Sequence, residues 1–161
     1  MSHVEFAACY VAEMPYLIRY LQKCFDDADF QDAADAAQNA FTALLTDWDS
    51  VRNPRAWLRT VAFREMLRRP ARAEYPLDTA HREPESLPAS RQVELREQEQ
   101  TVLSAIRQLP LRQRQVFALI YDQFSYREIA EIMNISEQAV RQNAKRARTT
   151  VKETLGILRK G

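Results

Sequence analysis

Apolar side chains recur along this chain at spacings of three and four residues, the period of an amphipathic helix. Residues 4–25 carry such a stripe around Pro15, where we expect a kink or a break between two helical pieces. A second run, residues 32–45, is rich in alanine, and we expect Asp32 to cap it. Its predicted inward positions are Ala33, Ala37, Phe41 and Leu44, and its outward positions include Asp35, Gln38 and Asn39.

Turn-forming residues interrupt the pattern over 47–54, and Pro54 biases Asn53 away from helix. A new helix is predicted over residues 55–69, with several arginines among its apolar positions. We interpret Trp48 and Trp57 first as core anchors. A polar loop beside a helix with outward arginines is also a place where an unstacked base can be held.

Residues 70–90 contain four of the seven prolines and little apolar periodicity, which is typical of a linker. The predicted domains are therefore residues 1–69 and residues 91–161. The second opens with a polar helix from about Arg91, and Pro110 suits the first position of the next helix. With only 2 glycines and little β-branched alternation, the chain is predicted to be all-α: two small helical domains joined by a proline-rich linker.

A helix-turn-helix pattern occupies residues 124–152. Ser125 with Glu128 three residues later forms a capping box, and Ser136 caps a second helix after a three-residue turn. In that second helix small and β-branched residues share one stripe, and long hydrogen-bond donors share the other side. The inward set is Val140, Ala144, Ala147 and Val151, and the outward set is Gln138, Arg141, Gln142, Lys145 and Arg148.

Charge is distributed unevenly although the net charge is only +1. Residues 1–66 sum to −4, residues 67–90 to 0 and residues 91–161 to +5, and five cations but no acid lie between Gln138 and Lys152. A run of one sign beside amide side chains suits phosphates and base edges. An acidic N-terminal part favours a protein partner. The alternative is a solvated basic face without a ligand.

Several classes of function lack their usual residues. Cys9 and Cys24 are isolated and the chain has 2 histidines, so we expect no metal, no disulfide and no cofactor. The carboxylates of residues 26–35 have no histidine near them in sequence, and no glycine-rich phosphate loop occurs, so an enzyme is not expected. No apolar run approaches the roughly 20 residues that span a bilayer, which predicts a cytoplasmic protein without membrane insertion.

Three stretches, taken in order, resemble a bacterial RNA polymerase sigma factor of the extracytoplasmic function group, over nearly the whole chain. Residues 35–41 are similar to that family's polymerase-binding helix. Residues 51–62 are similar to its segment that reads the −10 promoter element. Residues 109–116 with residues 126–130 are similar to its −35 domain.

The resemblance implies a role for each stretch. The helix of residues 35–41 would dock on core RNA polymerase, the loop and helix after Trp48 would melt and hold the −10 element, and the last helix would read the −35 element in promoter DNA. By this resemblance the polymerase-binding residues are Asp35, Gln38, Asn39 and Phe41; the −10 residues are Asn53, Arg55, Trp57 and Arg59; and the −35 residues are Gln138, Arg141, Gln142, Lys145, Arg146 and Arg148.

Such a protein is a specificity subunit that binds core polymerase and directs transcription initiation, and the family is often restrained by an anti-sigma protein. Two weak DNA-reading modules become tight when polymerase holds both, so the free chain is expected to bind duplex promoter poorly. Two alternatives remain open. The chain is a stand-alone helix-turn-helix regulator, or a sigma-like decoy that binds protein and does not start transcription.

Overall fold

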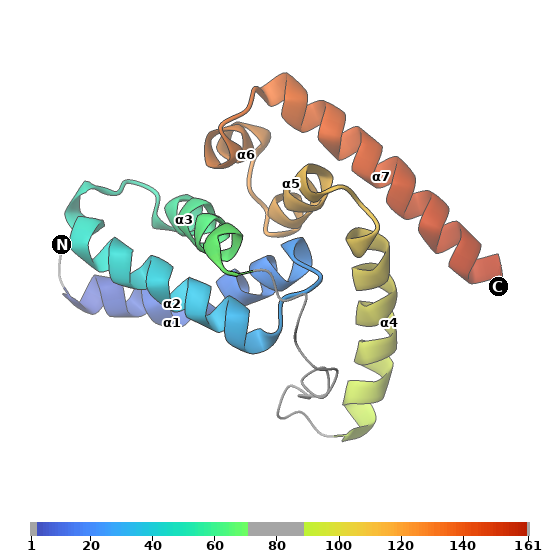
Figure 1. Ribbon diagram of the computed structural model, residues 1–161, viewed down its shortest axis with the longest axis horizontal. Helices are drawn as coiled ribbons and strands as arrows, with labels where there is room; N and C mark the ends of the chain where they lie inside the picture. Colours follow the sequence, from blue (N-terminus) through green and yellow to red (C-terminus); the bar gives the residue numbers. More distant parts are fainter. Residues whose placement is uncertain (1–2, 71–88, 161) are drawn as a thin grey trace.

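The computed structural model describes residues 3–70 and 89–160, and most of the predicted linker lies outside them. The described residues form seven α-helices and one short 3-10 turn, without a strand (Figure 1). The prediction of an all-α chain is thus confirmed. The predicted domain boundaries stay a prediction.

The N-terminal half contains α1 (His3–Cys24), α2 (Phe30–Asp47), η1 (Trp48–Ser50) and α3 (Pro54–Arg68). The break expected at Pro15 is absent, because α1 continues through it. Proline removes the amide that would bond to the carbonyl of Val11, four residues earlier. Val11 is 75% exposed and Pro15 is exposed as well, so water can satisfy that carbonyl.

The first turn of α2 also differs from expectation. The helix begins at Phe30, and the Asp29 carboxylate caps it by accepting a 2.8 Å hydrogen bond from the backbone N–H of Asp32. Asp32 is therefore not the cap. Its carboxylate instead accepts a 2.9 Å bond from Arg69, at the end of α3. This ion pair ties the start of α2 to the segment just before the predicted linker.

The C-terminal half contains α4 (Ala89–Arg107), α5 (Leu111–Tyr121), α6 (Tyr126–Met133) and α7 (Glu137–Lys160). Pro110 is the N-cap of α5 and not its first helical residue. In Figure 1, α6 lies near the top centre of the molecule, and α7 runs from there along the right side, away from α1 and α2.

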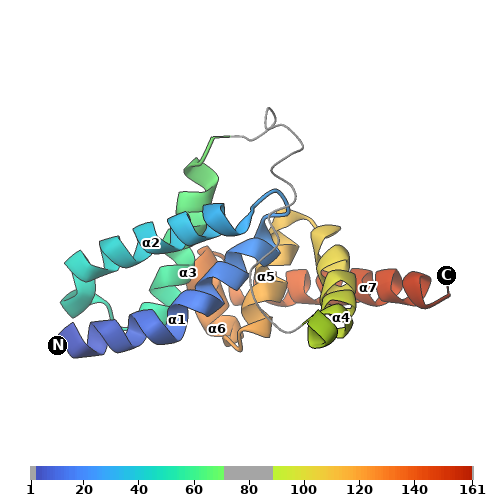
Figure 2. The ribbon, with the colours of Figure 1, turned by 90° about the horizontal axis from the view of Figure 1, so that it is seen from below.

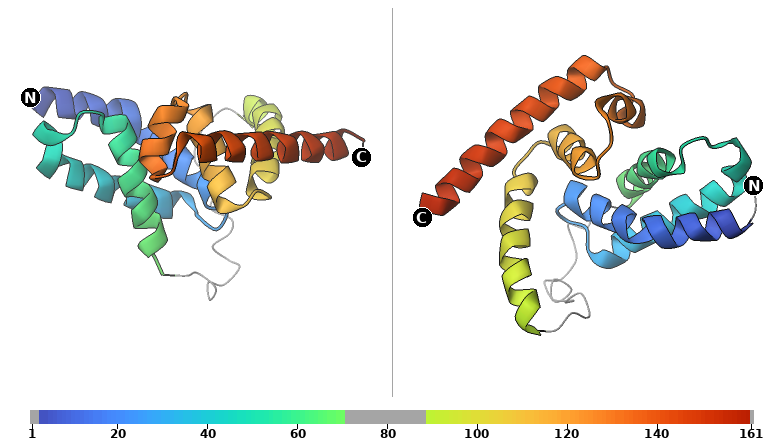
Figure 3. Two further views of the ribbon diagram at one scale, coloured as in Figure 1. Left: turned by 90° about the horizontal axis from the view of Figure 1, so that it is seen from above. Right: turned by 180° about the vertical axis from the view of Figure 1, so that it is seen from behind.

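The two halves share one apolar core. Its buried side chains come from α1, α2 and α3, from α5 and α6, and from the first turns of α7. Figures 2 and 3 show the end of α1 beside α5, and α3 beside α6. At the first of these contacts the Gln115 side chain donates a 3.1 Å hydrogen bond to the Tyr20 hydroxyl, and both residues are buried. The halves of the chain therefore pack together in this structure.

Candidate nucleic-acid interface

The first helix of the helix-turn-helix starts with the predicted capping box. The Ser125 hydroxyl accepts a 3.1 Å bond from the backbone N–H of Glu128, and the Glu128 carboxylate accepts a 3.0 Å bond from the backbone N–H of Ser125. That second bond is the main reason that the pKa of Glu128 is lowered, with a smaller contribution from the Asn53 amide. The box fixes the direction in which α6 begins.

The turn between α6 and α7 is closed by backbone and side-chain hydrogen bonds. Asn134 adopts the left-handed conformation with φ of 54°, which asparagine tolerates better than most residues. The amide of Ile135 then bonds to the carbonyl of Ala130 at 3.0 Å. The Ser136 hydroxyl accepts a 3.0 Å bond from the amide of Ala139, as an N-cap should. These contacts set the angle between the two helices.

Helix α7 has one face for packing and one for solvent. The predicted inward stripe is buried, and two of its four members are alanines, which allows α7 to approach its neighbours closely. All six predicted −35 residues are exposed: Gln138, Arg141, Gln142, Lys145, Arg146 and Arg148. The sequence periodicity therefore placed both faces of α7 correctly.

Two exposed arginines of this row are held by neighbours that the sequence analysis did not single out. Arg148 donates a 3.0 Å bond to the Tyr126 hydroxyl at the start of α6, and Arg141 pairs with Glu137 one turn earlier at 3.4 Å. Spacing of four residues could have indicated the second pair. Arginine can bind guanine, and glutamine can bind adenine, through two hydrogen bonds. The remaining cations can form ion pairs with phosphates.

Three of the four residues predicted to bind polymerase lie on the exposed face of α2. Asp35 accepts a 2.8 Å bond from Gln31, Gln38 accepts a 2.9 Å bond from Tyr10, and Asn39 lies 3.5 Å from the Glu65 carboxylate. Phe41 is only 1% exposed and packs edge-on against Phe6 and Tyr10. A buried Phe41 supports this surface from below and has almost no exposed area for a partner.

The residues predicted to bind the −10 element occupy the start of α3. Asn53 is the N-cap of α3, and its side-chain oxygen Oδ1 accepts a 3.2 Å bond from the backbone N–H of Ala56. Trp57 is half-buried against the core. Trp48 is half-buried too, and its ring packs edge-on against Phe6 with 5.4 Å between the ring centroids. Both tryptophans therefore act as packing residues here, as first interpreted.

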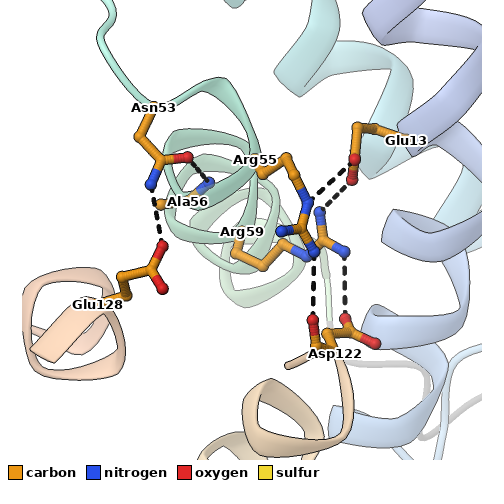
Figure 4. A network of polar contacts seen from close by, with 7 residues as sticks. All are labelled: Glu13, Asn53, Arg55, Ala56, Arg59, Asp122 and Glu128. Carbon is orange, nitrogen blue, oxygen red and sulfur yellow. Dashed lines mark hydrogen bonds and ion pairs between the residues drawn. The ribbon is translucent and has the colours of Figure 1, made fainter. Parts of the chain in front are cut away.

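Arg55 and Arg59 are bound within the chain (Figure 4). Arg59 is 0% exposed and bridges Glu13 of α1, at 2.9 Å, and Asp122 after α5, at 3.1 Å. Arg55 pairs with Glu13 at 3.0 Å and donates a 3.2 Å bond to the backbone carbonyl of Asp122. Arg59 thus has no exposed surface for DNA in this arrangement, and its predicted −10 role requires the halves to separate.

Comparison with known protein families gives a match in the C-terminal half. Residues 99–151 match the family described as sigma-70, region 4, and this range includes α5, α6 and the reading row of α7. This part of the chain is similar to sigma-70 region 4, and it is called region 4 below. No curated protein sequence matches the chain.

Two solved structures share the fold. One is the sigma factor RpoE in complex with the anti-sigma factor NepR from Bartonella quintana, with TM-score 0.68 and 19% identity over 95% of this chain and 98% of that chain. The other is CnrH in complex with the cytosolic domain of CnrY, with TM-score 0.69 and 22% identity over 97% of this chain and 90% of that chain. With the region 4 match, they confirm the predicted resemblance to sigma factors of the extracytoplasmic function group.

The acidic partners of Arg59 were not found from the sequence, although one signal was available. Arg59, Ala62 and Met66 follow the helical spacing of three and four residues, and all three are buried. A helical-wheel projection of α3 therefore places Arg59 on the same buried face as Ala62 and Met66. A buried arginine needs a carboxylate partner. The wheel alone does not say that one partner comes from region 4 and the other from α1.

No helix in the described parts of the chain combines the length and the apolar character that crossing a bilayer requires.

Proposed function

We propose that this chain is the promoter-specificity subunit of a bacterial RNA polymerase, that is, a working sigma factor. One observation carries the proposal. The residues that match region 4 contain a helix whose small residues pack inward and whose outward row, from Gln138 to Arg148, consists largely of exposed donors. A row of this kind fits the major groove of duplex DNA.

In this proposal each surface has one task. Region 4 reads the −35 element through Arg141, Gln142 and Lys145, and Arg146 and Arg148 contact phosphates. The start of α3, with Asn53, Arg55, Trp57 and Arg59, holds the melted −10 strand. The exposed side of α2 around Asp35, Gln38 and Asn39 docks on core polymerase. The protein then works in the cytoplasm and catalyses no reaction itself.

An anti-sigma protein is a further proposed partner. One similar solved structure is a complex of a sigma factor with an anti-sigma factor, and the other is a complex of CnrH with the cytosolic domain of CnrY. The alignments with these two structures cover 95% and 97% of this chain, which supports the proposal that a protein of this kind binds here. Capture of a protein that blocks transcription by this chain, and that releases it on induction, would identify the partner.

In vitro transcription tests the central claim. Purified core polymerase and the full chain are incubated with a library of genomic fragments, and run-off transcripts are sequenced. We expect defined start sites only when both proteins are present. Polymerase binding without transcripts would contradict the proposal and favour the decoy. Footprints on paired half-sites about one helical turn apart, made without polymerase, would favour the stand-alone regulator.

Base reading by α7 has its own test. Arg141→Ala and Gln142→Ala should each lower transcription from a cognate promoter by about 5- to 150-fold, because a bidentate base contact gives about 1–3 kcal/mol of discrimination. Arg107→Ala and Gln108→Ala are matched controls, since both residues are exposed at the end of α4 and outside the reading row. Full activity of both α7 variants would refute the assignment.

A further inference from the structure

Helix α7 begins with an acid in front of its row of cations. Glu137 is the first residue of α7, directly after the Ser136 cap, and the sequence has no other acid before Glu153. One turn further along, the Arg141 guanidinium donates to the Glu137 carboxylate at 3.4 Å. The two side chains are 46% exposed at Glu137 and 62% exposed at Arg141, so the pair is open to a ligand of the row.

An acid at this place lowers the affinity of the row for DNA. The phosphates of a duplex attract the cations between Gln138 and Arg148 whatever the base sequence is. The Glu137 carboxylate repels the same phosphates, and it therefore weakens binding to every duplex. An acid in the first turn also stabilises a helix, so a purely structural role is the alternative that an experiment has to separate.

The contact with Glu137 leaves Arg141 able to read a base. A guanidinium has five N–H donors in one plane, and a bidentate contact with guanine N7 and O6 needs two of them. A phosphate competes for the same donors with the same planar geometry. Because the Glu137 carboxylate lies beside these donors, it repels a charged phosphate more strongly than an uncharged base edge. Glu137 thus shifts the preference of Arg141 from phosphate toward guanine.

We propose that Glu137 is a specificity-determining residue of α7, whose carboxylate directs Arg141 to a guanine edge and keeps phosphates away from it. This inference rests on the reading role of α7 in the proposed function. Glu137 lowers the affinity of the chain for duplex DNA in general and raises its preference among −35 sequences. Loss of the carboxylate therefore changes these two quantities in opposite directions.

The test variant is Glu137→Gln, which removes the charge and keeps the side-chain volume. Glu153→Gln is the matched control, because Glu153 is also an exposed acid of α7. The two acids lie roughly 24 Å apart along the helix axis. That separation exceeds the screening length of about 10 Å in 0.1 M salt. Arg141→Ala and the double variant of Glu137→Gln with Arg141→Ala show whether Glu137 acts through Arg141.

The first measurement is made on the free full-length chain. Fluorescence anisotropy reports binding to a labelled duplex of randomised sequence over a series of salt concentrations. One more phosphate contact steepens the slope of log affinity against log salt by about 0.9, which corresponds to about fivefold tighter binding at 0.15 M salt. We expect Glu137→Gln to show both changes and Glu153→Gln to show neither. The double variant should have the slope of the unaltered chain.

The second measurement uses core polymerase and a promoter that run-off transcription has defined for the unaltered chain. Each base pair of its −35 element is changed in turn, and transcript yields give the preference at each position. We expect Glu137→Gln to lower the preference about fivefold at the position where Arg141→Ala lowers it. The double variant should lose no more than Arg141→Ala alone, and Glu153→Gln should keep every preference.

Three results would overturn the inference: no tighter binding of the randomised duplex by Glu137→Gln, an equal gain in Glu153→Gln, or base preferences that Glu137→Gln leaves unchanged. A purely structural role of Glu137 gives the first result, since a weaker helix start lowers binding to every duplex alike.

Transcription by the unaltered chain judges the proposed function separately. If the unaltered chain starts no transcripts, the proposed function fails, and the binding series with the randomised duplex alone judges Glu137. If it starts transcripts and Glu137→Gln keeps every base preference, only the inference about Glu137 fails.

Discussion

The hydrogen bond between Tyr20 and Gln115 offers a direct test of the packing between the two halves. Tyr20 is 0% exposed in α1, and Gln115 is 7% exposed in α5. Tyr20→Phe keeps the ring and removes only the oxygen that accepts the 3.1 Å bond from the Gln115 amide. The amide N–H then has lost its acceptor in a site with little access to water, and this loss sets the size of the effect.

A buried donor that loses its acceptor costs about 1–3 kcal/mol. We therefore expect Tyr20→Phe to lower the free energy of unfolding by about 2 kcal/mol. For a chain of this length each kcal/mol lowers the melting temperature by roughly 2–4 °C, so the expected fall is about 4–8 °C. Tyr10→Phe is the matched control, because the Tyr10 hydroxyl bonds to Gln38 at an exposed site. Its effect should stay below about 0.5 kcal/mol.

Urea denaturation followed by circular dichroism measures these differences. Gln115→Met and the double variant complete a thermodynamic cycle, in which we expect a coupling energy of about 1 kcal/mol or more. If Tyr20→Phe behaves like Tyr10→Phe and the cycle shows no coupling, then α1 and α5 do not pack in solution as they do here. The contact that covers the start of α3 would lose its support at the same time.

Two further predictions concern the turn and the thiols. Asn134→Ala should lower the free energy of unfolding by about 1 kcal/mol because Asn134 has φ of 54°, while Asn134→Gly should not, and a denaturation series that ranks the two equally would contradict this. Burial raises the pKa of Cys24 to about 12, so near neutral pH iodoacetamide should label the half-buried Cys9 first and Cys24 only after unfolding. Peptide mass spectrometry measures both rates, and equal labelling in the folded chain would show that Cys24 is accessible.

The sequence was most informative where structure depends on neighbouring residues. Ser125 with Glu128, and Ser136, identified two helix starts because a cap and its amide lie three residues apart. The faces of α7 followed from periodicity alone. At α2 the same reasoning named Asp32 as the cap, whereas the cap is Asp29, because the backbone conformation decides which of the acids near the start of a helix caps it.

Contacts between residues far apart in the sequence could not be predicted in this way. Arginine is seldom buried, so Arg59 was predicted to face outward although the spacing of α3 places it on the inward stripe. Its two carboxylate partners lie 46 and 63 residues away in the sequence. Local pattern contains no information about such partners. The same limit applies to Gln115 and Tyr20, which are 95 residues apart and meet only because the halves pack together.

One face of α7 is constrained by packing, and the opposite face is not. Ala144 and Ala147 sit in the buried stripe with almost no exposed area, so a larger residue at either position would crowd the neighbouring helices. Gln142, two positions before Ala144, and Lys145, directly after it, are exposed to solvent. Side chains on this outer face can therefore change without a loss of folding, so the scaffold of α7 leaves the chemistry of its outer face open.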